Sequence, residues 1–170
     1  EAHKQGNLED YFREERHKFL KNTARKYQAD YIVLAHNADD QAETVLMNLV
    51  RGSGPSGLSG MKLADNLIIR PLLTFPKSEI IHFAKINKLE WHEDSTNQDL
   101  KYTRNYIRHR VLPLLERINP KYLDNIARSA NIQQEIEDYI KEEARTNRLS
   151  PNKVPKPIRY EIFANLYEKA

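Results

Sequence analysis

Residues 30–36 read Asp30-Tyr31-Ile32-Val33-Leu34-Ala35-His36, and this stretch decides the fold class. The run is rich in β-branched and apolar side chains and is too continuous for a strand with one face in water, so it predicts a buried strand of a parallel sheet. After this strand comes a residue suited to cap the start of a helix. The acids and the helically spaced apolar residues that follow it predict a helix to about residue 50. Another amphipathic helix is predicted before the strand, over residues 7–27. The order helix, strand, helix is typical of an α/β protein.

Farther along the chain, the pattern changes from α/β to helical near residue 100. Residues 51–61 predict a loop, residues 66–73 a second strand and residues 76–86 a helix. The later helical patterns cover residues 107–118, with a kink at Pro113, residues 120–147 and residues 158–166. We therefore predict part of a parallel-sheet domain over residues 1–115, and over residues 116–170 a helical segment that starts a second domain.

The composition excludes several classes of protein. The chain has 170 residues, a formal net charge of +3, 30% charged residues and 39% hydrophobic residues, which describes a soluble globular protein. No apolar run approaches the roughly 20 residues that a membrane span needs. Cysteine is absent, which excludes disulfides, thiolate zinc sites, iron–sulfur ligation and thiol nucleophiles. An intracellular location is the simplest interpretation.

His36, Asp40 and Glu43 are the first candidate site. Their spacing of i, i+4 and i+7 predicts that they share one helix face, at the end of a strand where α/β proteins bind ligands. A histidine and two carboxylates there suit a divalent metal or an ammonium group. The alternative is structural, because acids in a first helical turn complement the helix dipole and a histidine at a strand end satisfies a hydrogen bond.

A glycine cluster is the second candidate, because four of the five glycines lie within residues 52–60. Such a loop, beginning at Arg51, Gly52 and Gly54, can bring backbone N–H groups close to a phosphate or a base, with the arginine as a fixed charge. It lacks the Gly-Lys-Ser/Thr ending of a Walker A sequence. The alternative is a flexible connection that caps the preceding helix at Gly52.

A basic stretch over residues 101–128 is the third candidate. Its seven cations are accompanied by two acids, Glu116 and Asp124, and tyrosines at 102 and 106 offer rings that stack on bases. The cations are Lys101, Arg104, Arg108, Arg110, Arg117, Lys121 and Arg128. This balance favours binding to RNA or to nucleotide phosphates over the alternative of a solvated helix face.

Taken in order, five motifs resemble the tRNA(Ile)-lysidine synthetase family. They are Ala35-His36-Asn37-Ala38-Asp39-Asp40-Gln41-Ala42-Glu43-Thr44, Arg51-Gly52-Ser53-Gly54 with Gly57-Leu58-Ser59-Gly60-Met61, Arg70-Pro71-Leu72-Leu73, Glu93-Asp94-Ser95-Thr96-Asn97-Gln98-Asp99, and Tyr102-Thr103-Arg104-Asn105-Tyr106-Ile107-Arg108. The resemblance implies an N-type ATP pyrophosphatase fold. It also implies a cytoplasmic ligase that uses ATP to adenylate carbon 2 of the wobble cytidine of an isoleucine tRNA. The amino group of L-lysine then displaces AMP.

The resemblance assigns roles to particular positions of this chain. It implies catalytic roles for His36, Asp40, Glu43 and Arg108, and binding of ATP or another substrate by Arg16, Arg51, Gly52 and Gly54. It implies tRNA binding by Lys101, Arg104 and Asn105. Mg²⁺ accompanies ATP, with Asp40 and Glu43 as its candidate ligands, and a homodimer is left open.

One departure from the family concerns its ATP-binding signature. A Ser-Gly-Gly-x-Asp-Ser segment is absent from all 170 residues, so we expect this chain to be a fragment that is inactive alone. Two other functions stay open. One is a tRNA cytidine thiolase of the same superfamily, and the other is a noncatalytic RNA-binding module.

Overall fold

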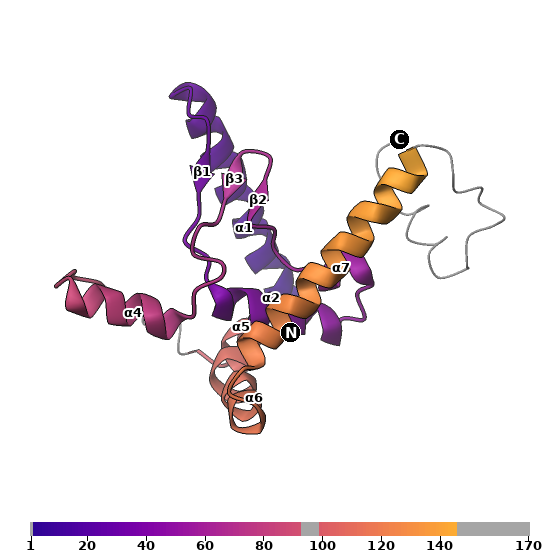
Figure 1. Ribbon diagram of the computed structural model, residues 1–170. Coiled ribbons are helices and arrows are strands. Elements are labelled where there is room, and N and C mark those ends of the chain that lie inside the picture. The colour runs from indigo at the N-terminus through magenta and orange to yellow at the C-terminus, as the bar shows by residue number, and fades with distance from the viewer. Residues whose placement is uncertain (1, 93–98, 146–170) are drawn as a thin grey trace. The chain divides into compact units, whose positions relative to one another are not determined.

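The computed structural model describes residues 2–92 and 99–145, whose ribbon is drawn in Figure 1. The chain divides into two compact units. One unit consists of the residues up to His36 together with Lys62–Leu72. The other consists of Asn37–Met61 and the described residues from Leu73 onward. The stretch at 93–98 and the helix predicted at 158–166 lie outside the described residues. Within the described part of the chain, no helix is long and apolar enough to cross a membrane.

The first unit is a small sheet with one long helix. Helix α1 (Ala2–Lys26) packs on strand β1 (Ile32–Val33), and the buried side chains of Ala24, Ile32 and Ile68 form the core between helix and sheet. β1 pairs in parallel with β3 (Ile68–Ile69), as predicted. Val33 is 62% exposed, however, because side chains alternate along a strand and the core lies on the face of Ile32. The prediction of a strand buried on both faces is wrong for this residue.

The second predicted strand is shorter than expected and is part of a hairpin. β2 (Ala64–Asp65) pairs antiparallel with β3, which gives the strand order β1-β3-β2 seen in Figure 1. Asn66, predicted to be in the strand, instead turns the chain with a φ of +50°, a conformation that asparagine tolerates better than most residues. The sequence analysis missed β2 because two exposed residues give no apolar signal.

The second unit begins with helix α2 (Ala38–Val50), which has a complete capping box at its start. The Asn37 side chain accepts a hydrogen bond from the N–H of Asp40, and the Asp40 carboxylate accepts one from the N–H of Asn37, both at 3.0 Å. These two bonds satisfy N–H groups that a helix start leaves open. The predicted helix start is therefore confirmed, and His36 precedes the helix rather than sharing a face with Asp40 and Glu43.

The end of α2 is a Schellman turn built on Gly52. This residue has a φ of +78° and donates its N–H to Leu49 at 3.0 Å, while Ser53 donates to Asn48 at 3.0 Å. The predicted capping role of Gly52 is thus confirmed. The loop predicted beyond it is wrong in one respect, because Pro55–Leu58 forms a one-turn helix, α3, that begins with proline at a favoured position.

The remaining helices follow the predicted order. They are α4 (Lys77–Ile86), α5 (Thr103–Tyr106), the π-helical η2 (Ile107–Val111), α6 (Leu112–Ile118) and α7 (Tyr122–Arg145). Pro113 explains η2, because its ring displaces the carbonyl of residue 109 and it has no N–H to donate. Leu112 accordingly donates to Ile107, five residues back. The regular α-helix is thus interrupted just before Pro113, and the kink predicted there stays a prediction.

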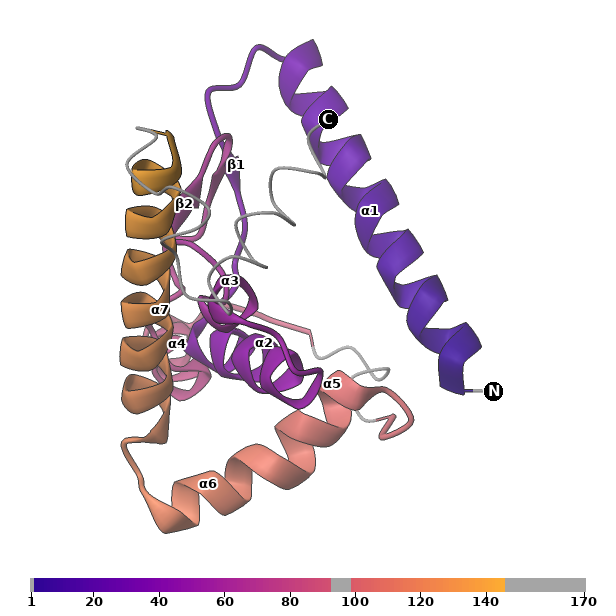
Figure 2. The ribbon, with the colours of Figure 1, turned by 90° about the vertical axis from the view of Figure 1, so that its right-hand side faces the viewer.

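The core of the second unit lies between α2 and the later helices. Ala42, Ile107 and Leu112 are buried there, and α7 runs alongside α2 and α3 (Figure 2). Glu137 of α7 is also buried. Its carboxylate accepts a hydrogen bond from Ser56 of α3 at 3.1 Å and forms an ion pair with Lys141. These contacts join α7 to the glycine-rich segment. The domain boundary predicted between residues 115 and 116 falls inside α6 and stays a prediction.

Candidate functional site

Four charged side chains of the second unit form a compact ion-pair cluster. Glu43 of α2 is completely buried, and its carboxylate accepts hydrogen bonds from Arg104 Nε at 2.7 Å, Arg108 Nε at 2.6 Å and Arg108 Nη2 at 2.9 Å. Asp40 Oδ1 accepts from Arg108 Nη2 at 3.1 Å and from Arg104 Nη2 at 3.4 Å. Two carboxylates and two guanidinium groups therefore neutralise one another.

Local structure explains how these side chains meet. Asp40 and Glu43 are three residues apart on α2, and Arg104 and Arg108 are four apart across α5 and η2, so each pair shares a helix face. Burial alone lowers the pKa of Arg108, but its hydrogen bond to Glu43 and the nearby acids raise that pKa above its ordinary value. The guanidinium groups are thus held charged and in fixed positions, which suits recognition of phosphate or carboxylate.

The donor set of Asp40 and Glu43 does not fit Mg²⁺ in this arrangement. Each of their four carboxylate oxygens accepts an N–H, three of them from arginines and Asp40 Oδ2 from the backbone of Asn37. Two guanidinium charges also repel a divalent cation. Among the described residues, no group of three or more histidine, aspartate or glutamate side chains is placed to hold a metal. In this arrangement the two carboxylates therefore hold arginines rather than a metal ion.

Tyr122 lies close enough to Glu43 to feel its charge, and its hydroxyl makes the stability of the protein depend on pH in the alkaline range. Burial, with the charges of Asp39, Glu116 and Glu43, raises the pKa of Tyr122 to about 12. Because an unfolded tyrosine has a pKa of about 10, the unfolded state ionises first as the pH rises. The contribution of Tyr122 to stability is therefore fully present below pH 10 and is lost as the pH rises through about 12.

We expect Tyr122→Phe to reduce the fall in unfolding free energy between about pH 10 and 12, because phenylalanine carries no titrating hydroxyl. Urea unfolding of both proteins at several pH values in that window measures the effect. Tyr139→Phe is the matched control, since Tyr139 lies on the same helix and is 66% exposed. An equal fall in Tyr122→Phe and the parent would contradict this assignment.

The glycine-rich segment is anchored to α2 by the Gln41 side chain. Gln41 is 4% exposed, and its amide donates to the Met61 carbonyl at 3.0 Å and accepts from the Met61 N–H at 2.8 Å. Asn48 makes a second anchor by donating to the Gly57 carbonyl at 2.7 Å. Of the two interpretations of this segment, the flexible connection therefore loses support, because the segment is held at both its middle and its end.

The other predicted site residues lie in different surroundings. His36 belongs to the first unit and accepts a hydrogen bond from Arg70, and Arg16 is exposed on α1. Arg51, Gly52 and Gly54 are exposed where α2 ends and α3 begins. Lys101 is exposed, whereas Asn105 is buried and donates to the Asp99 carbonyl at 2.9 Å. Of the predicted set, the structure thus brings Asp40, Glu43, Arg104 and Arg108 together in one cluster.

Sequence reasoning missed Gln41 and Arg70 as residues that position others. Gln41 gives little signal, because a buried glutamine on a helix has no characteristic spacing. Arg70 gives a clearer sequence signal, because it follows an apolar strand that lies beside the strand leading to His36. In a parallel pair, residues that follow the two strands meet at one edge of the sheet.

Residues 1–115 match the model of the PP-loop domain, an ATP-binding family. The chain belongs to the PP-loop domain family. Its fold agrees with a solved structure, the U34-tRNA thiolase NcsA from Methanococcus maripaludis, with a TM-score of 0.58 at 22% identity over 71% of this chain and 41% of that one. The predicted α/β fold of the ATP pyrophosphatase type is confirmed.

Several curated relatives of this PP-loop domain are named tRNA(Ile)-lysidine synthase. The chain is 43% identical to the protein from Thermosipho africanus, with 80% of this chain and 32% of that protein covered. It is 45% identical to the one from Legionella pneumophila strain Lens, over 76% and 31%, and 42% identical to that from Enterococcus faecalis, over 82% and 31%. The chain therefore spans about a third of the length of these relatives.

Proposed function

We propose that this PP-loop domain is part of a tRNA(Ile)-lysidine synthetase. In the proposed reaction, ATP activates carbon 2 of the wobble cytidine of an isoleucine tRNA as an adenylate, and pyrophosphate leaves. The amino group of L-lysine then attacks carbon 2 and displaces AMP, which gives lysidine. The observation that carries the proposal is the identity of 42–45% with relatives of that name, over at least three quarters of this chain. The cytoplasm is the proposed location, because the substrate is a tRNA.

The ion-pair cluster supports a separate role for each group of site residues in the proposed reaction. Asp40 and Glu43 act through the arginines that they orient, and Arg108 supplies fixed positive charge where phosphate charge develops. Arg16, Arg51 and the N–H groups at Gly52 and Gly54 are assigned to ATP or another substrate.

A third group of residues is assigned to the tRNA. Lys101 and Arg104 are assigned to it, and Asn105 supports their segment through its bond to Asp99. Mg²⁺ enters the proposal only as the ion that accompanies ATP phosphates, and no residue of this chain is assigned to it.

The experiment uses the full-length product of the gene with the cognate tRNA transcript. We expect AMP release that depends on both L-lysine and the tRNA, and a nucleoside whose mass has increased by lysine with loss of water. A mass change of sulfur for oxygen would replace the proposal with a tRNA cytidine thiolase. Binding of tRNA with no mass change would favour a noncatalytic module. Sedimentation of the same protein tests the homodimer, which stays a prediction.

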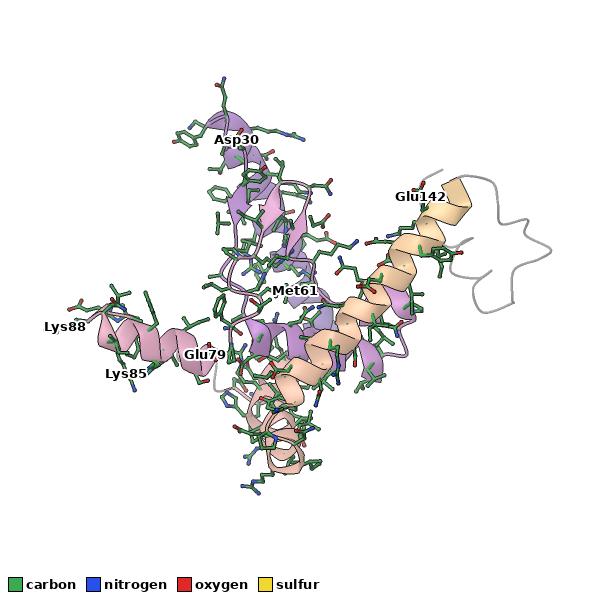
Figure 3. All side chains as sticks on the ribbon, viewed as in Figure 1. Asp30, Met61, Glu79, Lys85, Lys88 and Glu142 are labelled. Atoms are coloured by element: carbon green, nitrogen blue, oxygen red, sulfur yellow. The ribbon has the colours of Figure 1, made fainter. Side chains whose placement is uncertain are left out.

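Lys101→Ala tests the proposed tRNA contact. If the exposed Lys101 side chain neutralises one phosphate, its loss should weaken tRNA binding and reduce the slope of log K against log salt by about one unit. Binding of the full-length protein to tRNA is measured at several salt concentrations. The matched control is Lys85→Ala on α4, a lysine at a distance in sequence from the basic stretch (Figure 3). An unchanged slope for Lys101→Ala would remove this residue from the interface.

A further inference from the structure

One face of α1 changes from apolar to cationic along its length. Near the C-terminal end of the helix, Leu20 and Ala24 pack against the core of the first unit. Positions 13 and 17 continue this face toward the N-terminus, because they lie at helical spacing from Leu20, and positions 16 and 21 flank it. We call these four residues, Arg13, Arg16, His17 and Lys21, the cationic face of α1.

The cationic face lies at the carboxyl edge of the small sheet, where Arg70 follows the last residue of β3. Burial lowers the pKa of the His17 imidazole, and the charges of the other three members of the face and of Arg70 lower it further. For Arg70, burial lowers the pKa, Asp65 on β2 raises it and Arg13 lowers it. The face therefore lies beside Arg70, on the half of α1 that continues past the strands (Figure 2). Ligands of α/β proteins bind at this edge.

Acidic partners of the cationic face are absent from the described part of the chain. Arg13, Arg16 and Lys21 are exposed, and none of them takes part in an ion pair between described residues. Glu15 instead pairs with Lys18 at 2.7 Å, on another side of α1. Like charges three or four residues apart on a helix repel one another, so binding of an anion would stabilise this face.

Phosphate is the anion that the arrangement fits best. The planar forks of Arg13 and Arg16 match phosphate oxygens, and Lys21 adds a compact charge. The helix rises by about 12 Å between residues 13 and 21, which is long enough to contact more than one phosphate group. Arg70 is 8% exposed and donates to the Lys62 carbonyl at 2.7 Å, so it adds positive charge rather than a direct contact.

We propose that the cationic face of α1 is a binding surface for the phosphate groups of a substrate, and that Arg13, His17 and Lys21 contact this substrate together with Arg16. The surface follows from the first unit alone. The identity of its ligand rests on the proposed function, which offers two sources of phosphate, the tRNA backbone and ATP. The positive field of the face also attracts either polyanion toward the carboxyl edge of the sheet.

The test variant is Arg13→Met combined with Lys21→Met, which removes two cations and keeps an apolar side chain of similar length at each position. The matched control is Lys18→Met combined with Arg25→Met, which makes the same change in charge at exposed residues on other sides of α1. Both are made in the full-length product of the gene. Binding of tRNA alone at several salt concentrations, and of ATP alone, is measured without L-lysine, so that no lysidine forms.

The two sources of phosphate give different results. If the tRNA backbone is the ligand, the test variant should reduce the slope of log K against log salt by about 1.5 units and leave ATP binding unchanged. If ATP is the ligand, its affinity should fall about 10-fold or more while the tRNA slope keeps the parent value. Parent values for both ligands in the test variant would overturn the proposal, and so would equal losses in the control.

A measurement on the parent protein covers the case in which the test variant does not fold. In spectra of ¹³C-labelled histidine, His17→Gln assigns the His17 signal by its disappearance. The pKa of His17 should rise when tRNA or ATP saturates the protein, because a phosphate beside the imidazole favours its protonated form. A pKa that neither ligand changes would also overturn the proposal. Absence of lysine-dependent AMP release in the parent enzyme would instead count against the proposed function.

Discussion

Glu43→Gln is expected to lower the free energy of unfolding by about 3 kcal/mol, because it leaves two guanidinium groups without their buried partner. The value lies at the low end for breaking a buried ion pair, since the Arg104 and Arg108 side chains keep 33% and 23% of their surface exposed to water. Glutamine has nearly the shape of glutamate, so lost charge rather than a cavity causes the effect. Urea unfolding followed by circular dichroism measures it.

The control for Glu43 is Glu79→Gln, an exposed acid in the first turn of α4, which should change stability by less than about 0.5 kcal/mol (Figure 3). A double-mutant cycle of Glu43→Gln with Arg104→Met should be strongly non-additive, because a hydrogen bond joins the two side chains directly. If Glu43→Gln were as stable as the parent, the arginines would be solvated and the cluster would not hold α2 to η2.

Gly60→Ala is expected to cost about 3 kcal/mol for two separate reasons. Gly60 has a φ of +64°, which costs an alanine about 1–2 kcal/mol. A Cβ at this position would also lie 2.7 Å from Gln41 Nε2 and 2.9 Å from Cδ and Oε1. The amide must then move, and both of its hydrogen bonds to Met61 are lost at about 1 kcal/mol each.

Gly52→Ala is the matched control for Gly60→Ala. It has the same kind of backbone, with a φ of +78°, but nothing within 4 Å of an added Cβ. Only the conformational cost of about 1–2 kcal/mol should appear. The difference between the two variants thus isolates the Gln41 anchor. If Gln41→Ala is combined with Gly60→Ala, the joint loss should be smaller than the sum, and full additivity would contradict the clash.

Local patterns predicted the helices well, because capping and apolar spacing are properties of neighbouring residues. Asn37 and Asp40 form the capping box at the start of α2, and the helix that contains Pro113 follows a π-helical turn. The strands are harder to predict from sequence, because β1 and β3 each contain only two residues and β2 has no apolar signal. The resemblance to the lysidine synthetase family depends on the ordered motifs rather than on these short strands, and the match of residues 1–115 to the PP-loop domain agrees with it.

The candidate site was predictable in its residues but not in their partners. Spacing placed Asp40 and Glu43 together, and it placed Arg104 and Arg108 together, but nothing in the sequence indicated that these two pairs bind each other. The contacts join positions more than 60 residues apart, and such pairing depends on the packing of α2 against η2. The same limitation hid the bond between Arg70 and His36, whose positions are 34 residues apart.

The separation between Glu43 and its arginines also orders events during synthesis. A buried carboxylate is costly without a partner, and its partners lie 61 and 65 residues downstream. While a ribosome is translating the segment between them, α2 has no favourable way to bury Glu43, so docking of this helix must wait until Arg108 has left the exit tunnel. A nascent chain arrested before that point should expose α2 to proteases, and one arrested after it should protect the helix.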